Sequence, residues 1–570
     1  MEPPYERPPR AEAGWAQRHA VELYVRTYTT MLQSSGEIRI DSLQQAHLAM
    51  RSALHPLAAD REMDMGAFLY AIRRLPATLA RSRRVVLGQS RQGFEKTLGL
   101  DISDWERVQA PARRRSWYYD GGDTLAVLLA SPSDVDDVVP VLVAFQIEWN
   151  KLHHLLSAEG VAVGAAREAA HVAAEDWSRL LEAWSDDVEE NLARVVAEEC
   201  HIILRLIGGS HVGYARTAAR WWQPVRVVMS ELDVAEAPVY FVSSNVHSLV
   251  NVLSGVAFQL EPEITEHARK VSPGLAAELD KLESGRVSAS RANWLYFAAR
   301  DLFDCHPDAT YFRGRRIELE AEVGIRHVAA EATGIDSAVQ IVRLASLQAD
   351  RLDPRVGRID AERLRQSRAA IVNIDYPLGL AAYHLLRQVA ESMPWLLGVY
   401  VMGKAATLNA DVGDILIPNA VHNEHSGNTY WLDNCFTAAD VQPHLVFGSV
   451  LDNQRAVTVR GTFLQNLDYL EFYYRGRYTV VEMEAGPYLD ACYEVTMPGR
   501  HPLQEQVNMS QPGFDLGIVH YASDTPYTQA RTLGARGLSY HGMDATYAAA
   551  IAVARRILAQ EGALQTADQA

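Results

Sequence analysis

The stretch Val480-Val481-Glu482-Met483-Glu484-Ala485 predicts a short buried strand that delivers two acidic side chains into a turn. Val480 and Val481 are β-branched and favour a strand, and residues 485–494 can form a helix. Further along, residues 517–524 (Gly-Ile-Val-His-Tyr-Ala-Ser-Asp) predict a second buried strand with polar residues at its C-terminal end. Because open α/β sheets bind ligands outside the carboxyl ends of their strands, these two strand ends could share one pocket.

This pair of motifs resembles the purine nucleoside phosphorylase and nucleosidase superfamily. In that family a Val-Glu-Met-Glu-Ala segment binds the ribose, and a Ser-Asp pair on a later strand handles the purine base. The resemblance implies that Glu484 grips the ribose hydroxyls, that Met483 packs against the sugar, and that Glu482 holds the sugar or orients water. It also implies that Asp524 donates a proton to N7 of the leaving base, with Ser523 orienting it.

The chemistry of N-glycosidic cleavage explains these residue types. Breaking the bond builds positive charge on the sugar and negative charge on the base. A carboxylate near the sugar stabilises the first charge, and a protonated acid at the base neutralises the second. Plainer alternatives stay open: the two glutamates could line a solvated strand end, and the Ser-Asp pair could cap a helix.

Further segments of the C-terminal third carry the same resemblance. Residues 369–375 predict an apolar strand that enters a turn and then an alanine- and leucine-rich helix, as in the family's first strand and loop. Residues 397–406 resemble the strand that ends in a glycine-rich loop, here containing Gly403 and Lys404, which the resemblance places at the ligand. Residues 413–418 resemble the Gly-Asp-Ile strand that follows.

One aromatic side chain of the family stacks on the purine base. Residues 460–465 resemble the strand that precedes this ring, and Tyr469 is the first candidate for it, with Phe463 second. An aromatic face stacking on a purine is a sensible use of either ring. Either could equally belong to the core, and for Phe463 the core is the stronger expectation.

The chain departs from the family where phosphorylases hold inorganic phosphate. Relatives use an arginine in the first loop, and an arginine and a serine around the glycine-rich loop. Here the first loop, residues 375–380, has no Arg or Lys and contains Asp375, which would repel phosphate. Only Lys404 could contact an anion near Gly403, and a single lysine offers too few donors for a strong phosphate site. The residues therefore favour water as the nucleophile and a nucleosidase as the enzyme.

Two alternatives to a nucleosidase remain. One is a phosphorylase whose phosphate ligands come from unexpected places, and the other is a nucleoside-sensing module without turnover. Residues 523–526 (Ser-Asp-Thr-Pro) resemble the Ser-Asp-Lys-Pro of AMP nucleosidases more than the phosphorylase segment. If the substrate is a nucleotide, Lys404 or an arginine from elsewhere could hold its 5′-phosphate.

The amino-acid composition and net charge limit the classes of partner that this protein is expected to bind. Of the 570 residues, 48% are hydrophobic and 22% are charged, which is ordinary for a globular protein. A net charge of −17 makes nucleic acid an unsuitable partner, and the short basic run Arg113–Arg115 is expected to be a solvated linker. No apolar run approaches the length of a membrane span. The four scattered cysteines fit reduced thiols in the cytoplasm and give no zinc spacing. We expect no metal or cofactor, and the resemblance implies a homo-oligomer.

The expected fold class is α/β, in three parts. Residues 1–115 are expected to be a helical N-terminal region, and residues 116–350 a mixed α/β and helical domain of unknown role. Residues 365–562 are expected to form the catalytic domain, which the resemblance implies is a three-layer α/β/α unit with a mixed central sheet. The N-terminal half is therefore expected to be mostly helical, with a smaller α/β portion.

Overall fold

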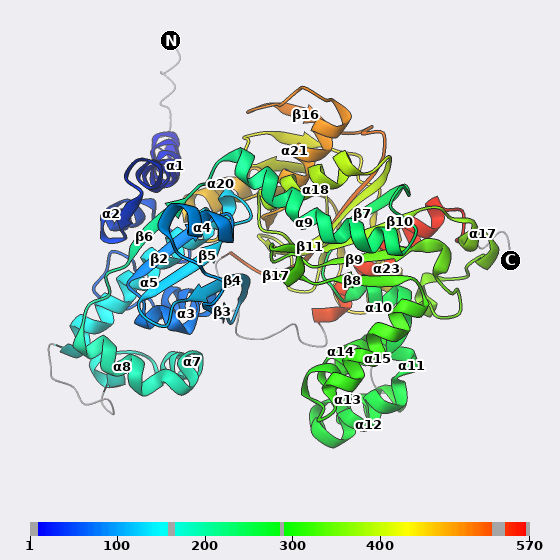
Figure 1. Ribbon diagram of the computed structural model, residues 1–570, viewed down its shortest axis with the longest axis horizontal. Coiled ribbons are helices and arrows are strands. Elements are labelled where there is room, and N and C mark those ends of the chain that lie inside the picture. Colours follow the sequence, from blue (N-terminus) through cyan, green and yellow to red (C-terminus); the bar gives the residue numbers. More distant parts are fainter. Residues whose placement is uncertain (1–9, 158–165, 286–289, 527–541, 566–570) are drawn as a thin grey trace, which may run out of the picture.

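The computed structural model describes residues 10–157, 166–285, 290–526 and 542–565. Elements from the first part of the chain gather in one lobe, and most later elements form a second, larger lobe (Figure 1). Each lobe is built around its own sheet. The α/β class predicted from the sequence is therefore confirmed, with both parallel and antiparallel strand pairs in each lobe.

The N-terminal lobe contains a six-stranded sheet in the order β1-β6-β2-β5-β4-β3. Strand β2 lies between β5 and β6 and is parallel to both, with Val86 opposite Ala126 and Arg205. The strands are β1 (Glu37–Arg39), β2 (Arg84–Gly88), β3 (Glu106–Ala110), β4 (Arg113–Tyr119), β5 (Thr124–Leu128) and β6 (Ile203–Ile207).

Helices pack on this sheet, and the long helix α5 is buried along most of its length. They are α1 (Arg10–Ser35), α2 (Asp41–Met50), α3 (Met65–Arg74), η1 (Ala77–Arg81), α4 (Arg91–Leu98), α5 (Pro132–Ser157), α6 (Ala166–Ala169), α7 (Ala174–Trp184), η3 (Ser185–Asp187) and α8 (Val188–Ala197). The expectation that residues 1–115 are helical is corrected by β1, β2 and β3. A buried run as short as Arg84–Gly88 gives no periodic signal that separates a strand from a helix.

The larger lobe holds an eleven-stranded mixed sheet in the order β16-β13-β12-β14-β15-β11-β7-β10-β9-β8, with β17 paired to β11 and β12. The pairings β11–β17, β17–β12, β12–β14, β14–β15 and β15–β11 close five strands into a ring. The strands are β7 (Val239–Ser244), β8 (Ile325–Val328), β9 (Val339–Arg343), β10 (Ala370–Asp375), β11 (Leu396–Thr407), β12 (Ile415–Asn423), β13 (Thr429–Trp431), β14 (Val450–Thr458), β15 (Val480–Glu482), β16 (Gln506–Asn508) and β17 (Asp515–Asp524).

Both faces of this sheet are covered, as alternating side chains of one strand show. On β7, Tyr240 and Val242 pack in one hydrophobic cluster with helices α10, α14 and α23, while Val239 and Phe241 pack in another with α9, α18 and α21. Because side chains alternate across a strand, these two clusters lie on opposite faces of the sheet.

The other helical elements within the described ranges belong to the larger lobe. They are α9 (His211–Glu231), α10 (Ser248–Ser254), α11 (Val256–Gln259), α12 (Glu261–Val271), α13 (Pro273–Glu283), α14 (Arg291–Cys305), α15 (Ala309–Glu322), α16 (Ala330–Thr333), η4 (Leu344–Ser346), η5 (Pro354–Val356), α17 (Ala361–Gln366), α18 (Ala381–Ser392), α19 (Ala438–Val441), η6 (Gln442–His444), α20 (Leu467–Arg475), α21 (Ala485–Thr496) and α23 (Gly542–Gln560). Within the described ranges, no helix combines the length and apolar character that crossing a membrane requires.

Each sheet combines strands from more than one of the three domains expected from the sequence. Strands β7, β8 and β9 come from residues 116–350, yet β7 lies between β10 and β11 in the larger sheet. The expected boundary between residues 350 and 365 therefore runs through one continuous sheet. The boundary at 115 falls inside β4, which pairs with β3 and β5 of the smaller sheet.

A loop of the larger lobe is anchored in the smaller one. Residues 460–465 form this loop after β14, instead of the expected strand. The ring of Phe463 packs in the N-terminal core, edge-on to Tyr70 at 5.3 Å between centroids. The backbone N–H of Ala53 donates to the carbonyl of Gln465 at 2.8 Å. Figure 1 shows helix α20, which follows the loop, beside the elements of the N-terminal lobe.

Candidate active site

A cavity of about 480 Å³ lies where the two lobes meet, outside the strand ends of the ring. Its lining comes from both lobes: Arg74, Arg113, Asn245, Val246, His247, Asp375, Tyr376, Pro377, Leu378, Lys404, Ala405, Ala406, Val459, Thr462, Gln465, Val481, Glu482, Met483, Glu484, Tyr521, Ser523, Asp524 and Thr546. The two acidic motifs singled out in the sequence therefore open into one space.

Strand β11 brings the two motifs together. Its residue Ala406 pairs with Val481 of β15 on one side and with Asp524 of β17 on the other. The register shifts at this point, because Ala405 pairs with Ala522 and Ser523 is left as an extra residue in β17. Bulges of this kind re-aim side chains near functional sites.

Glu482 is held by the protein on both of its carboxylate oxygens. One oxygen accepts the backbone N–H groups of Glu484 and Ala485, each at 2.6 Å, at the start of helix α21. The other accepts the hydroxyl of Thr458. Burial raises the pKa of Glu482 to about 7, although these three donors act in the opposite direction. Its oxygens thus position the start of α21 and have less capacity left for a ligand.

Glu484 is less completely held and keeps part of its surface open. Burial raises the pKa of its carboxyl group to about 8, and the nearby charge of Glu482 raises it further. Arg113 of the N-terminal lobe acts in the opposite direction. At neutral pH Glu484 is therefore largely protonated and Glu482 about half protonated, and groups that titrate in this range can accept or donate protons.

Asp524 lies at the end of β17 with 3% of its surface exposed, and Ser523 beside it is half-buried. The Ser523 hydroxyl lies 3.4 Å from the carbonyl oxygen of Ala405 on the neighbouring strand. Met483 also lines the cavity, between the two glutamates. Asp524 ends strand β17, and Glu484 follows strand β15. Both strands pair with β11, one on each side of it.

Lys404 lines the cavity and is exposed, whereas Gly403, one residue earlier on β11, does not line it. A Cβ added at Gly403 would meet the ring of Tyr376 at 3.5 Å, an ordinary contact distance. Gly403 therefore lies on the strand that leads to the cavity, and a side-chain Cβ would fit at this position.

Neither aromatic candidate for base stacking lines the cavity. Phe463 is 2% exposed inside the N-terminal core, which confirms the stronger expectation for this ring and leaves it away from the cavity as a second candidate for stacking. Tyr469 on α20 stacks against Tyr473, with 5.9 Å between ring centroids. The rings that do line the cavity are Tyr376 and Tyr521, whose hydroxyl groups lie 2.9 Å apart.

The N-terminal lobe contributes side chains that the sequence did not single out as site residues. Arg113 belongs to strand β4 and lines the cavity, so the run at 113–115 is not the solvated linker expected from the sequence. Arg74, the last residue of α3, also lines it. No local pattern marks either arginine, because their place depends on how the two lobes pack.

The end of strand β7 supplies two more lining residues. The side-chain oxygen of Asn245 accepts the N–H groups of His247 and Ser248, at 3.0 and 2.6 Å, at the start of α10. Burial, together with the charges of Arg300, Arg316 and Lys404, lowers the pKa of His247 to about 4. Its Nδ1 is buried and has no hydrogen-bond partner among the described groups.

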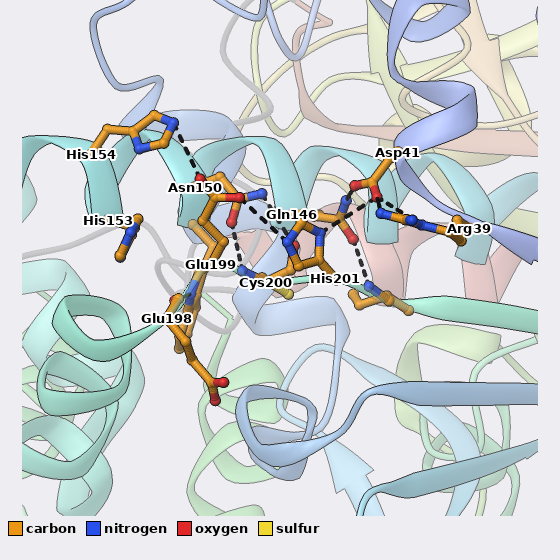
Figure 2. A network of polar contacts seen from close by, with 12 residues as sticks. Arg39, Asp41, Gln146, Asn150, His153, His154, Glu198, Glu199, Cys200 and His201 are labelled. Atoms are coloured by element: carbon orange, nitrogen blue, oxygen red, sulfur yellow. Dashed lines mark hydrogen bonds and ion pairs between the residues drawn. The ribbon is translucent and has the colours of Figure 1, made fainter.

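A second cavity, of about 330 Å³, lies in the N-terminal lobe near Glu198–His201. The polar groups around it pair with one another, as Figure 2 shows: the Asn150 amide bonds both backbone groups of Cys200, and Gln146 accepts the N–H of Ile202. Such a network serves to tie α5 to the start of β6.

One group of described residues near this cavity could offer ligand atoms to a metal ion. The side-chain atoms of His153, His154 and Glu199 lie within 4.8 Å of one another. His154 and Glu199 are 67% and 39% exposed, and Glu199 also pairs with His201. Their side chains are therefore not held for a metal, as structural metal sites require.

Comparisons with known proteins give a family and a set of distant structural likenesses. The chain belongs to a family of unknown function, DUF6909, whose model matches residues 40–559. No curated protein matches the chain.

The solved structures that match the chain include nucleosidases and phosphorylases. The 5′-methylthioadenosine/S-adenosylhomocysteine nucleosidase from Neisseria meningitidis is 14% identical, with a TM-score of 0.28 over 42% of this chain and 94% of that chain. The corresponding enzyme from S. pneumoniae is 12% identical, with a TM-score of 0.27 over 44% of this chain and 94% of that chain. Uridine phosphorylase from Schistosoma mansoni is 12% identical, with a TM-score of 0.27 over 44% and 83%. At such scores these likenesses carry no argument, and the function must be argued from this chain's own residues.

Proposed function

We propose that this protein hydrolyses the N-glycosidic bond of a purine nucleoside or nucleotide. The observation that carries the proposal is the pairing of Ala406 with both Val481 and Asp524, which sets Glu484 and Asp524 at one cavity. A cavity of about 480 Å³ is within the range of small-molecule sites. A purely structural use of these residues would not need two acidic motifs at the same opening.

In the proposed reaction, Glu484 holds the ribose hydroxyls and stabilises the positive charge that develops on the sugar. Asp524, protonated, donates to N7 of the base as the bond from C1′ to the base nitrogen breaks. The oxygen of water forms the new bond to C1′, and the proton that the water loses passes to a carboxylate of the Glu482–Glu484 pair. The pKa of about 7 leaves part of the Glu482 carboxyl unprotonated at neutral pH, so Glu482 can accept this proton. Glu484, whose pKa is about 8, stabilises the sugar in its carboxylate form, which becomes more abundant as the pH approaches 8.

The remaining sequence candidates take supporting roles in this proposal. Met483 packs against the sugar, Ser523 orients Asp524, and Lys404 contributes positive charge at the mouth of the cavity. Because Tyr469 and Phe463 lie outside the lining, Tyr376 and Tyr521 are better placed to contact the base. We expect the reaction in the cytoplasm and in a homo-oligomer, with no metal or cofactor.

The test is a screen of purine nucleosides and their 5′-monophosphates for release of free base, read by mass spectrometry. The proposal predicts base release in phosphate-free buffer, together with an equal amount of free pentose or pentose 5-phosphate. Absence of any released base across the panel would contradict it. Binding of a nucleoside without base release would instead favour a sensing module.

A phosphorylase is the second candidate, and the presence of Arg74 and Arg113 in the lining favours it. These two guanidinium groups supply the anion-binding capacity that the first loop lacks. Adding inorganic phosphate to the same screen separates the two reactions. Formation of ribose 1-phosphate, and base release only when phosphate is present, would replace hydrolysis by phosphorolysis.

A further inference from the structure

We propose that Arg74 and Arg113 of the N-terminal lobe form a phosphate subsite on the sugar side of the main cavity, so that this site takes a phosphate-bearing ligand. This inference rests on the proposed glycosidic function and narrows its substrate class. The phosphate could be the 5′-phosphate of a nucleotide or an inorganic phosphate bound beside a nucleoside. Both sources present the same tetrahedral anion to the two guanidinium groups.

The charges of this region do not balance within the protein. Three guanidinium groups, those of Arg74, Arg113 and Arg115, act on one another's charge near the carboxylates Asp134 and Asp137. Asp134 and Asp137 form hydrogen bonds with the side chains of Arg113 and Arg115. Arg115 bonds Asp134 at 2.7 and 3.1 Å and Asp137 at 3.0 Å, and Arg113 bonds Asp137 at 2.6 Å.

Arg74 is the guanidinium that remains. It lies over the ring of Tyr70 at 4.3 Å, and it forms no hydrogen bond or ion pair with any residue in the described part of the chain. Burial lowers its pKa, and the charges of Arg113 and Arg115 act in the same direction. Burial also disfavours the charge of Arg113, yet Asp137 raises the pKa of that group. Arg74 is thus partly buried, and the charge of Asp137 and the ring of Tyr70 favour its charged form without a direct bond to a carboxylate.

Arg113 has donor capacity left as well. Its Nε–H is buried and finds no hydrogen-bond partner among the described groups. Both arginines line the cavity, so their side chains reach the same opening. Two guanidinium groups with free N–H donors match the oxygens of a phosphate, because each can donate two parallel hydrogen bonds.

The position of Arg113 relative to Glu484 indicates on which side of the cavity the phosphate would bind. The charge of Arg113 lowers the pKa of Glu484, so the two groups are close enough to interact. Glu484 is the residue proposed to hold the ribose, and the base is proposed to lie at Asp524. A phosphate bound by Arg113 would therefore lie next to the sugar, where both a 5′-phosphate and a nucleophilic phosphate must be.

The experiment is isothermal titration calorimetry of the full chain with AMP, GMP and IMP, with their nucleosides, and with inorganic phosphate alone and together with each nucleoside. The inference predicts that the monophosphates bind at least tenfold more tightly than the nucleosides, or that inorganic phosphate binds and tightens nucleoside binding. The first result assigns the phosphate to a nucleotide and the second to a co-substrate. Equal affinity of nucleosides and monophosphates, with no binding of inorganic phosphate, would overturn the inference.

Variants assign the effect to residues. Arg74→Gln is expected to weaken binding of the phosphate-bearing ligand roughly 10- to 100-fold, with nucleoside affinity unchanged. Arg74→Lys should recover part of the loss, since it keeps the charge without the planar fork. The matched control is Arg73→Gln, because Arg73 is the neighbouring, partly buried arginine on α3 and does not line the cavity. Equal losses in Arg73→Gln and Arg74→Gln would contradict a specific subsite.

The titrations are repeated in the Asp524→Asn background, where binding is measured without turnover, so that the outcome separates this inference from the proposed reaction. Arg74-dependent binding of a monophosphate with no base release would support the subsite and contradict the hydrolase. Base release from unphosphorylated nucleosides, unaffected by Arg74→Gln or by phosphate, would do the reverse. Since Arg113 also pairs with Asp137, Arg113→Gln is read only alongside its thermal unfolding curve, and Arg74 carries the decision.

Discussion

In the main cavity, the side formed by the larger lobe carries carboxyl groups, and the side formed by the N-terminal lobe carries guanidinium groups. The acids stand at strand ends of a closed ring and are held by the hydrogen bonds of neighbouring backbone. The arginines come from the end of a helix and the start of an edge-side strand in the smaller lobe. The chemistry proposed for the base and sugar thus belongs to one lobe, and the recognition of charge to the other.

The smaller cavity of the N-terminal lobe sharpens this contrast. There the amide groups of Gln146 and Asn150 are satisfied by backbone partners from residues 200–202. In the main cavity, by contrast, donors on Arg113 and His247 lack partners among the described groups. Buried polar groups without partners cost free energy, so a site that keeps them is one where a ligand completes the hydrogen bonds.

The largest effect is expected from the acid at the base. Asp524→Asn removes the proposed proton donor while keeping the size of the side chain, and should lower the rate of base release by roughly two to four powers of ten. Steady-state assays on the best substrate of the screen measure it. Glu471→Gln is the control, since Glu471 is an exposed acid on α20 that pairs with Arg475. A rate within threefold of wild type in Asp524→Asn would remove Asp524 from the chemistry.

The paired and unpaired arginines should differ in stability. Arg115→Gln leaves the buried Asp134 without its main partner and should reduce the free energy of unfolding by about 3 kcal/mol. Arg74→Gln removes a charge that has no carboxylate partner and should change it by less than about 0.5 kcal/mol. Urea unfolding of both variants measures this. Equal destabilisation by the two substitutions would mean that Arg74 is a structural residue.

A smaller effect on activity is expected at the sugar. Glu484→Gln keeps a hydrogen-bond acceptor but loses the negative charge, and should lower kcat/KM by roughly 10- to 100-fold. The loss should fall on kcat more than on KM, because the charge on the sugar develops only in the transition state. An effect confined to KM would show that Glu484 only binds the ground state.

The remaining expected effect is on the pH dependence of stability. The pKa of Glu484 is raised from an ordinary value of 4.5 to about 8, so the unfolded chain loses its proton first as the pH rises. The stability due to this group is therefore present below pH 4.5 and is lost as the pH rises through 8. Urea unfolding of wild type and Glu484→Gln at pH 5 to 8 should show wild type declining relative to the variant. A constant difference across this range would contradict the raised pKa.

The sequence predicted the acidic side of the cavity because its signals are local. Val480 and Val481 precede Glu482, and a helix-forming stretch follows, so a strand, a turn and a helix can be recognised in one short segment. The arginine side could not be predicted in this way. The run at 113–115 has the composition of a solvated linker, and only the pairing of β4 between β3 and β5 turns Arg115 inward and brings Arg113 to the cavity.

The sequence could not show which core Phe463 joins or where the sheets end, for a related reason. Phe463 follows a strand in a sequence context that allows either a ligand contact or a core position, and it fills the core of the other lobe. Strand β7 is a short apolar run, and its partners β10 and β11 are far away in the sequence. Strand pairing over such distances leaves no local pattern.

The most direct measurement is a crystal structure of the Asp524→Asn variant with a purine nucleoside 5′-monophosphate. The account predicts one ligand in the main cavity, with N7 of the base at residue 524, the ribose hydroxyls at Glu484 and the phosphate at Arg74 and Arg113. A ligand bound with its sugar away from Glu484, or in another cavity, would contradict the claim that the two acidic strand ends act on one glycosidic bond.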